Sequence, residues 1–101
     1  MFGKLGDMMG KLQEMKQKAE EIKNKLNDTI IQTESAGGDI RIEISGNREM
    51  KKLGLSEVLQ HGDKAELEKQ LLTALNKAIA EADKVNESEM KKVATGLLPG
   101  L

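Results

Sequence analysis

The chain has 101 residues, of which 38% are hydrophobic and 33% charged, and Phe2 is its single aromatic residue. A net charge of −1 excludes a uniformly basic nucleic-acid binder, and the absence of cysteine excludes disulfides and thiolate metal sites. This length suits one domain that buries a modest share of its surface, so a second copy is a natural source of further burial.

The first predicted element is an amphipathic helix over residues 5–28. Its apolar residues recur at alternating spacings of three and four, the pattern of a heptad seam. They are Leu5, Met8, Leu12, Met15, Ala19, Ile22 and Leu26. Lys, Glu and Gln, which favour helix, lie between them. So narrow a seam predicts a second helix packed against it, from the same chain or from a second copy.

Three strands are predicted next. The middle one alternates polar and apolar side chains, and in the last one Leu53 and Leu55 are expected to face inward. Residues 35–38 and the pair Gly46-Asn47 are turn signals. Two tight connections predict an antiparallel meander. The strands are expected over residues 29–34, 39–45 and 48–55.

A long helix is predicted over residues 64–94, after a linker or short helical turn. Asp63 is expected to cap it, with Glu66 three residues later as in a capping box. Gly96 is expected to end the helix and residues 96–101 to form a loose tail. Its apolar face includes alanines that would let another helix approach closely. This face consists of Leu67, Leu71, Leu75, Ala78, Ala82 and Val85.

The order of helix, three-stranded meander and long helix predicts an α+β fold in a single domain over residues 1–101. No apolar run approaches the roughly 18 residues that span a bilayer. The N-terminus also lacks the apolar core of a signal peptide. We therefore expect a cytoplasmic protein with no membrane partner.

The sequence lacks the residue sets that common catalytic mechanisms require. One histidine, His61, and no cysteine leave Ser-His-acid and Cys-His catalytic sets unsupported, and His61 with Asp63 does not make a metal site. Gly37-Gly38 is too short for a phosphate-binding loop. We expect no enzyme, no cofactor, no metal and no small-molecule substrate.

Taken in order, these features resemble the YbaB/EbfC family of bacterial nucleoid-associated proteins. The resemblance covers nearly the whole chain, although Ser56-Glu57 stands where the family commonly has Asp-Pro. It implies a tweezer-like homodimer that binds double-stranded DNA in the nucleoid with little sequence preference, and that shapes the nucleoid or influences transcription. The matching segments are Met8, Met9, Leu12, Gln13 and Met15, then 34–38, then Ile40, Ile42, Ile44 and Gly46, then 75–78, and finally Met90, 95–97 and 99–100.

A nearly neutral chain can bind DNA if its charges are segregated. If the two helices pack antiparallel, lysines gather at an arm tip, and a second candidate surface lies on the strands, where Glu43 and Glu49 partly cancel it. Lysine contacts phosphate but reads no base, so we expect weak, salt-sensitive and largely sequence-independent binding. The candidate DNA-binding residues are Lys4, Lys11, Lys16, Lys18, Lys91 and Lys92 on the arms, and Arg41, Arg48, Lys51 and Lys52 on the strands.

Other interpretations of the same residues stay open. The lysines could simply be a solvated face that keeps the protein soluble. A prefoldin-like holdase chaperone would use apolar residues at the helix tips to hold clients. A protein–protein adaptor would dock through its acidic last helix and bind DNA only indirectly. The tip residues that favour the holdase are Phe2, Leu5, Met8, Met9, Leu97 and Leu98.

Overall fold

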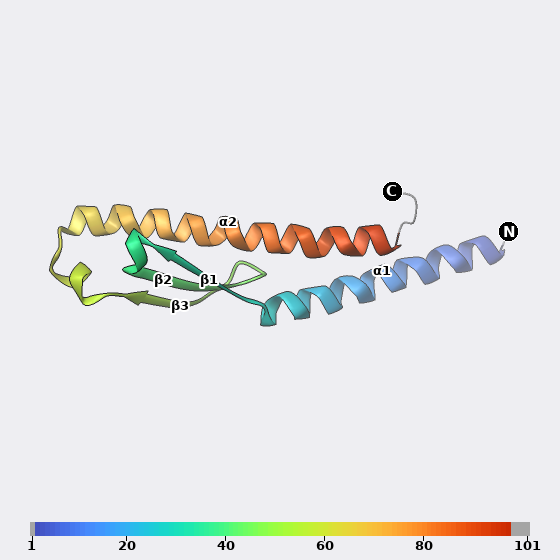
Figure 1. Ribbon diagram of the computed structural model, residues 1–101. Helices are drawn as coiled ribbons and strands as arrows, with labels where there is room; N and C mark the ends of the chain where they lie inside the picture. Colours follow the sequence, from blue (N-terminus) through green and yellow to red (C-terminus); the bar gives the residue numbers. More distant parts are fainter. Residues whose placement is uncertain (1, 98–101) are drawn as a thin grey trace.

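The computed structural model describes the backbone of residues 2–97 and the side chains of residues 4–59 and 62–95. The α+β fold and the order of elements are as the sequence predicts (Figure 1). The molecule is a rod that measures 71 × 22 × 17 Å. Its elements are α1 (Phe2–Asp28), β1 (Ile30–Ser35), η1 (Ala36–Gly38), β2 (Ile40–Ser45), β3 (Met50–Leu55), η2 (Glu57–His61) and α2 (Lys64–Leu97).

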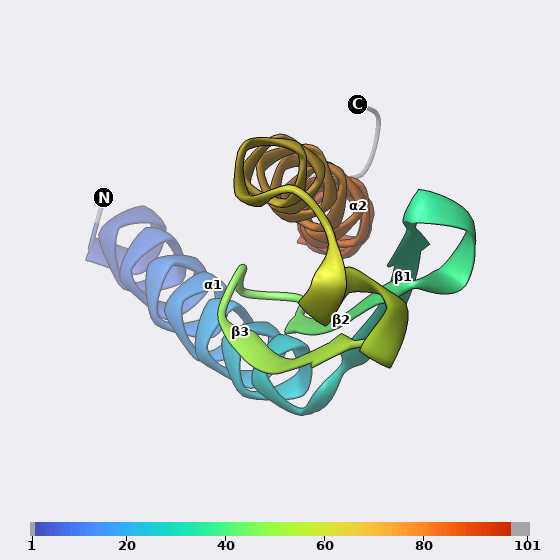
Figure 2. The same cartoon turned by 90° about the vertical axis from the view of Figure 1, so that its left-hand side faces the viewer.

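The three strands form an antiparallel sheet in the order β1-β2-β3. Helix α2 lies across one face of this sheet and packs on β1 and β2 (Figure 2). Between them lies the core, in which isoleucines of β2 meet alanines of α2. The core residues are Ile40, Ile42, Ile44, Ala74, Ala78 and Ala82, each exposed by 2% or less. The small alanines therefore let α2 pack closely on the sheet. The sequence predicted that they would pack against another helix instead.

Left-handed backbone at the two turns explains where the strands stop. The first turn holds Ala36, Gly37 and Gly38 at φ values of 53°, 68° and 95°. In the second turn Arg48 has a φ of 67°, and its N–H donates to the Ser45 carbonyl over 3.0 Å. Because this conformation cannot continue a strand, β3 begins at Met50 rather than at the predicted residue 48.

Helix α2 starts where the sequence predicts and ends later. The Asp63 carboxylate accepts a hydrogen bond from the Ala65 N–H over 3.2 Å, which satisfies one free amide of the first turn. The other half of the capping box is not formed, because Glu66 accepts from Gln70 instead. Gly96 does not end the helix, which continues to Leu97. Residues 98–101 of the predicted tail lie outside the described part of the chain.

Strand β3 turns the predicted side chains toward the core side of the sheet, but a single chain does not bury them. Leu53 and Leu55 pair with Ile42 and Ile40, so they lie on the same face of the sheet as the core. They are nevertheless 53% and 39% exposed. The reason is the position of α2, which packs on the other two strands and leaves β3 uncovered.

The predicted seam of α1 is covered along only half of its length. Near the sheet Leu26 is buried, and Ala19 and Ile22 are half-buried where α1 meets the end of α2. Farther out, Leu5 and Leu12 are 61% and 63% exposed. Helix α1 continues past the end of α2 toward its own N-terminus (Figure 1). We call residues 4–15 the free half of α1.

Candidate nucleic-acid interface

The β2–β3 turn anchors α1 to the sheet. The Gly46 N–H donates to the carbonyls of Leu26, over 2.9 Å, and Thr29, over 3.0 Å. A Cβ atom on Gly46 would come within 2.6 Å of Leu26 Cδ2, so only glycine allows this approach. The contact fixes the point from which α1 leaves the sheet.

Three asparagines extend this anchor to both helices. Asn47 Nδ2 donates to the carbonyl of Lys23, over 2.9 Å, and to Asn27 Oδ1, over 2.5 Å. On the other side, Asn86 Nδ2 of α2 donates to the Gly46 carbonyl over 3.0 Å. In the sequence, the pair Gly46-Asn47 indicates only a turn. Nothing in the pattern of α2 marked Asn86, because an isolated asparagine in a helix gives no signal of its partner.

One helical turn farther along, ion pairs among Lys25, Glu89 and Lys92 join the two helices, and we call this group the Glu89 bracket. Glu89 lies between two lysines: Lys25 Nζ is 3.1 Å from one carboxylate oxygen, and Lys92 Nζ is 3.3 Å from the other. Hydrogen bonds from Lys25 and then Lys92 lower the pKa of the Glu89 carboxyl below its ordinary value. The bracket thus favours the ionised carboxylate and holds α1 beside α2.

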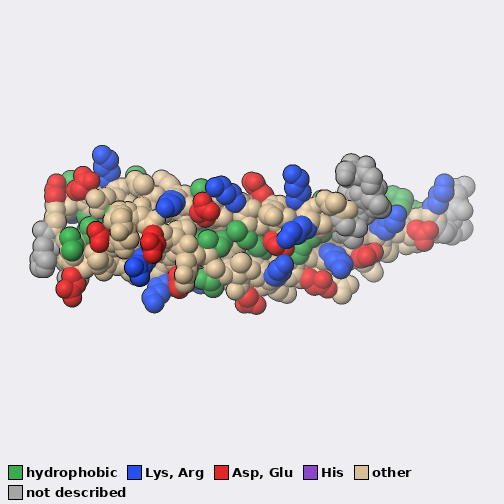
Figure 3. All heavy atoms as spheres, viewed as in Figure 1, with side chains coloured by type: hydrophobic (Ala, Val, Ile, Leu, Met, Phe, Trp, Pro, Cys, Tyr) green, Lys and Arg blue, Asp and Glu red, His purple; other side chains and the backbone are tan. Residues whose placement is uncertain are grey.

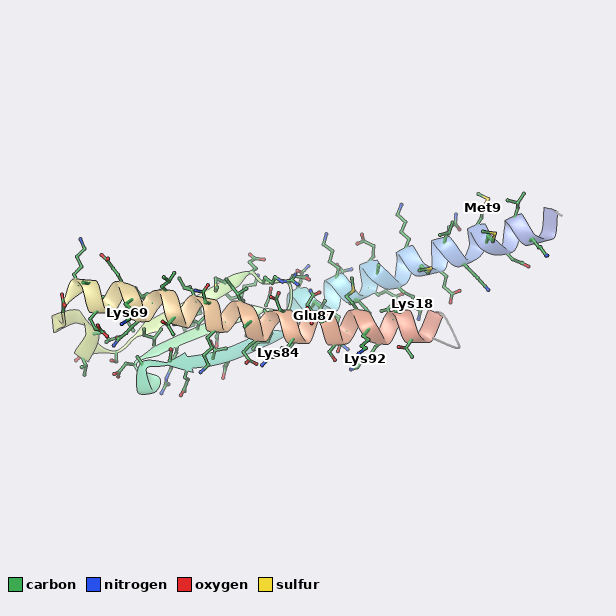
Figure 4. The ribbon with its side chains drawn as sticks, turned by 90° about the horizontal axis from the view of Figure 1, so that it is seen from above. Met9, Lys18, Lys69, Lys84, Glu87 and Lys92 are labelled. Carbon is green, nitrogen blue, oxygen red and sulfur yellow. The ribbon has the colours of Figure 1, made fainter. Side chains whose placement is uncertain are left out.

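This bracket also sets which lysines come together. The helices run antiparallel, so counting eight residues outward from the Lys25–Glu89 pair brings Leu97 level with about residue 17 of α1. Lys16 and Lys18 therefore lie near the end of α2, which carries Lys91 and Lys92. Figure 4 shows Lys18 and Lys92 in this region. Lys4 and Lys11 lie beyond it on the free half of α1, so the arm lysines form a line along a rod rather than one cluster at a tip.

The strand cations do not form one surface. Arg41 and Lys52 lie on the sheet face opposite α2, because Arg41 alternates with buried isoleucines and Lys52 pairs with Glu43. Arg48 is in the turn and forms an ion pair with Asp83 of α2. Two more of the strand cations form ion pairs: Arg41 with Glu34 at 3.5 Å and Lys51 with Glu49 at 3.2 Å.

A smaller share of the predicted arm lysines than of the strand cations forms ion pairs. Among the described side chains, Lys92 is the only predicted arm lysine that forms an ion pair, and Glu89 is its partner. Basic side chains, which are all lysines here, lie along the length of the arm with acidic side chains between them (Figure 3). The predicted arm lysines without an ion pair among the described side chains are Lys4, Lys11, Lys16, Lys18 and Lys91.

Other kinds of site find little support within the described residues. No group of three or more His, Asp or Glu side chains there is placed to hold a metal ion, and the side chain of His61 lies outside the description. A shallow hollow on the outer sheet face is lined by charged and polar side chains such as Gln32, Arg41 and Lys52. No helix in this part of the chain is long and apolar enough to cross a membrane.

Comparisons with known proteins give consistent results. The model of the YbaB/EbfC DNA-binding family matches residues 1–97. A nucleoid-associated protein of Hahella chejuensis is 33% identical over 95 residues, which span 94% of this chain and 88% of the relative. A nucleoid-associated protein of Agathobacter rectalis is 31% identical over 102 residues, which span 100% and 90% of the two chains. The crystal structure of an uncharacterized protein from Helicobacter pylori matches with a TM-score of 0.73 at 28% identity, over 97% of each chain.

Proposed function

Since the chain belongs to the YbaB/EbfC DNA-binding family, we propose that it binds duplex DNA as a homodimer, through lysines along the arm that α1 forms with the end of α2. The arm is defined here as α1 together with residues 81–97 of α2. Its role is to coat or organise nucleoid DNA and thereby to influence gene expression. The observation that carries the proposal is the difference in ion pairing between the arm and strand cations.

Unpaired lysines suit a phosphate-binding surface. A lysine already bound to a carboxylate must give up that partner before it contacts a phosphate, whereas an unpaired one releases counterions from DNA directly. The strand cations Arg41, Arg48 and Lys51 are held by acids of the same chain. We therefore place DNA on the arm and assign Arg41, Arg48 and Lys51 to the stability of the fold. The remaining strand cation, Lys52, forms no ion pair among the described side chains and lies on the sheet face opposite α2.

The arm is suited to binding that is largely independent of sequence. The chain has only two arginines, Arg41 and Arg48, and neither lies on the arm. Lysine is a flexible point charge that neutralises phosphates without the planar fork that reads guanine. The affinity should therefore fall steeply with salt and vary little between duplexes of different sequence.

Dimerisation is supported by an apolar surface that one chain leaves uncovered. Leu53 and Leu55 of β3 lie on the core side of the sheet but outside the reach of α2. Leu72 and Ile79 of α2 are 62% and 38% exposed. They lie on the same flank of α2 as Asp83. Asp83 pairs with Arg48 in the β2–β3 turn, so this flank lies on the side of β3. We call these four residues the open face, which consists of Leu53, Leu55, Leu72 and Ile79.

We propose that a second copy covers the open face. The helix α2 of the second copy could cover β3 of the first, and the reverse contact would follow by symmetry. Each Leu or Ile side chain that becomes fully buried contributes about 1.5–3 kcal/mol. Two arms would then project from one platform, which doubles the number of lysines that a duplex can meet.

The proposal is tested by a gel shift with a random 40-base-pair duplex over a range of salt concentrations. The test variant is Lys18→Glu with Lys91→Glu, one lysine from each helix of the arm. The matched control is Lys64→Glu with Lys69→Glu, the same change of charge at the opposite end of α2 (Figure 4).

We expect the arm variant to bind more weakly. For every phosphate that the arm no longer neutralises, the slope of log affinity against log salt should become shallower by about 0.9. The control should keep most of the wild-type affinity. Equal losses in both variants would mean that net charge rather than the arm governs binding, and no shift by the wild type would remove the proposal.

A holdase remains the second candidate, because apolar residues on the free half of α1 are exposed. Met8 and Met9 are both 62% exposed, and methionine adapts to varied clients. An aggregation-suppression assay separates the two functions. Suppression without a salt-sensitive gel shift would favour the holdase.

A further inference from the structure

The strongest unexplained feature is the outer part of the α1 seam. Its residues lie on one stripe of the helix, and no described element covers them. Leu5, Met8 and Leu12 are 61%, 62% and 63% exposed, and Met15 is 38% exposed. We call these four residues the free seam. Nearer the sheet, the same stripe continues into Ile22 and Leu26, which the rest of the chain covers.

Lysines flank the free seam on both sides. In heptad notation, with Leu5 at position a, the flanking positions are e and g, which face a partner helix across the seam. Of the six such positions within residues 4–23, five are lysine and the other is methionine, whereas Asp7, Glu14 and Glu21 all fall at position c, away from the seam. The flanking residues are Lys4, Met9, Lys11, Lys16, Lys18 and Lys23.

This pattern selects the charge of whatever covers the seam. A second α1 helix would set lysine against lysine along the contact, which is unfavourable. DNA would satisfy the lysines but would leave the leucines and methionines in water. The covered part of the stripe shows the chemistry that does fit, because there α2 packs on the seam and its Glu89 pairs with Lys25, the next flanking lysine.

We propose that the free seam binds an acidic amphipathic helix of a partner protein, with apolar residues at heptad spacing and Asp or Glu beside them. Such a helix would continue along α1 the type of contact that α2 makes lower down. The apolar residues of the partner pack on the free seam, and its carboxylates pair with Lys4, Lys11, Lys16 and Lys18.

Competition with DNA follows, and this part rests on the proposed function. The flanking lysines are the same residues that we assign to phosphate contacts. A carboxylate-bearing helix seated on them would occupy the arm and weaken its hold on the duplex. The partner would thus act as a regulator that releases DNA.

The test uses two synthetic peptides of three heptads, labelled with fluorescein, and contains no DNA. Both have leucine at positions a and d; one has glutamate at e and g, and the other has lysine there. Fluorescence anisotropy should show that the full chain binds the acidic peptide and not the basic one. Binding of neither peptide, or of both equally, would overturn the proposal.

Two variants separate the apolar from the charged contribution. Met8→Gln with Leu12→Gln keeps the charge and the helix propensity, and should abolish binding of the acidic peptide while leaving DNA affinity unchanged. Lys11→Glu with Lys16→Glu should weaken the acidic peptide about tenfold and create binding of the basic one. The control Lys64→Glu with Lys69→Glu should bind the acidic peptide as the wild type does.

The remaining outcomes identify other occupants. One such outcome is that the chain binds neither peptide but binds phosphatidylglycerol vesicles. If the variant Met8→Gln with Leu12→Gln loses that vesicle binding, the occupant of the free seam is a lipid surface and the proposal is wrong. Assembly beyond the dimer that depends on the same two residues would replace it with a second copy. Because the peptide assay contains no DNA, its failure is distinguishable from a failure of the chain to shift a duplex.

Discussion

At the scale of single residues, the β2–β3 turn controls the direction of α1. Gly46 touches Leu26 of α1, while its carbonyl accepts from Asn86 of α2. One residue therefore contacts both helices of the arm. A substitution at Gly46 should change the direction of α1 along its whole length, because the helix is rigid beyond this contact.

Replacing Gly46 with alanine should destabilise the protein by about 1–3 kcal/mol, because the added methyl group would overlap Leu26. Urea unfolding measures this cost. The matched control is Gly54→Ala, whose added Cβ would meet nothing closer than the Arg41 carbonyl at 3.9 Å. Its cost should stay below about 1 kcal/mol, and similar costs for the two variants would contradict the role of the close contact.

The Glu89 bracket predicts a dependence of stability on pH. Hydrogen bonds from Lys25 and Lys92 lower the pKa of Glu89, so its ionised form is favoured in the folded state. Its contribution is therefore present above the pKa of the unfolded chain and is lost as the pH falls through the folded pKa.

Glu89→Gln should be less stable than the wild type at neutral pH, and this difference should disappear in acid. Urea unfolding between about pH 3 and pH 7 measures it. Glu87→Gln is the control, since Glu87 forms no ion pair among the described side chains and should keep wild-type stability at neutral pH. A constant difference between the wild type and Glu89→Gln across this pH range would show that the bracket does not act through charge.

At the scale of elements, α1 is one helix in two environments. Near the sheet its seam packs on α2 and the β2–β3 turn, whereas residues 4–15 have neither contact. An uncovered helix depends on its own propensity, which is marginal over so few turns. The two halves should therefore open with different free energies.

Native-state hydrogen exchange should show faster exchange at residues 4–15 than at residues 19–28. Gly10→Ala should slow exchange in the outer half, since alanine favours helix by about 1 kcal/mol and the added Cβ would meet no atom within 4 Å beyond its chain neighbours and the adjacent backbone of its own helix. Equal protection along wild-type α1 would mean that something covers the free seam in solution.

At the scale of the whole molecule, the open face and the arm are separate surfaces. The open face lies on β3 and the adjoining flank of α2, while the arm lysines to which we assign DNA binding lie on α1 and the far end of α2. The proposed dimerisation through the open face would therefore leave both arms available. The proposed dimer would also bind DNA bivalently, so affinity should depend on the oligomeric state.

Leu53→Asp should convert the dimer to a monomer, because it places a charge in the proposed interface. Size-exclusion chromatography with light scattering measures the mass, and the salt slope of DNA binding should fall by about half in the monomer. Ile30→Asp is the control: Ile30 is 46% exposed but belongs to the opposite face of the sheet. A wild-type chain that is monomeric at the concentrations used for DNA binding would refute the dimer.

Local patterns in the sequence determined most of the elements and the family. Strict alternation in residues 39–45 and the Asp63 cap gave β2 and the start of α2 nearly to the residue, since both signals depend only on neighbours in the chain. The order of these signals also supported the resemblance to the YbaB/EbfC family, which the family match confirms.

The tertiary structure decided how those elements meet. It placed Ala78 on a sheet rather than on a helix, left Leu53 uncovered, and advanced α1 past the end of α2. Periodicity shows which side of an element is apolar, but not which element covers that side or how far two helices slide past each other. Those outcomes depend on contacts between residues distant in sequence, such as Gly46 with Leu26 and Lys25 with Glu89, and no local pattern encodes them.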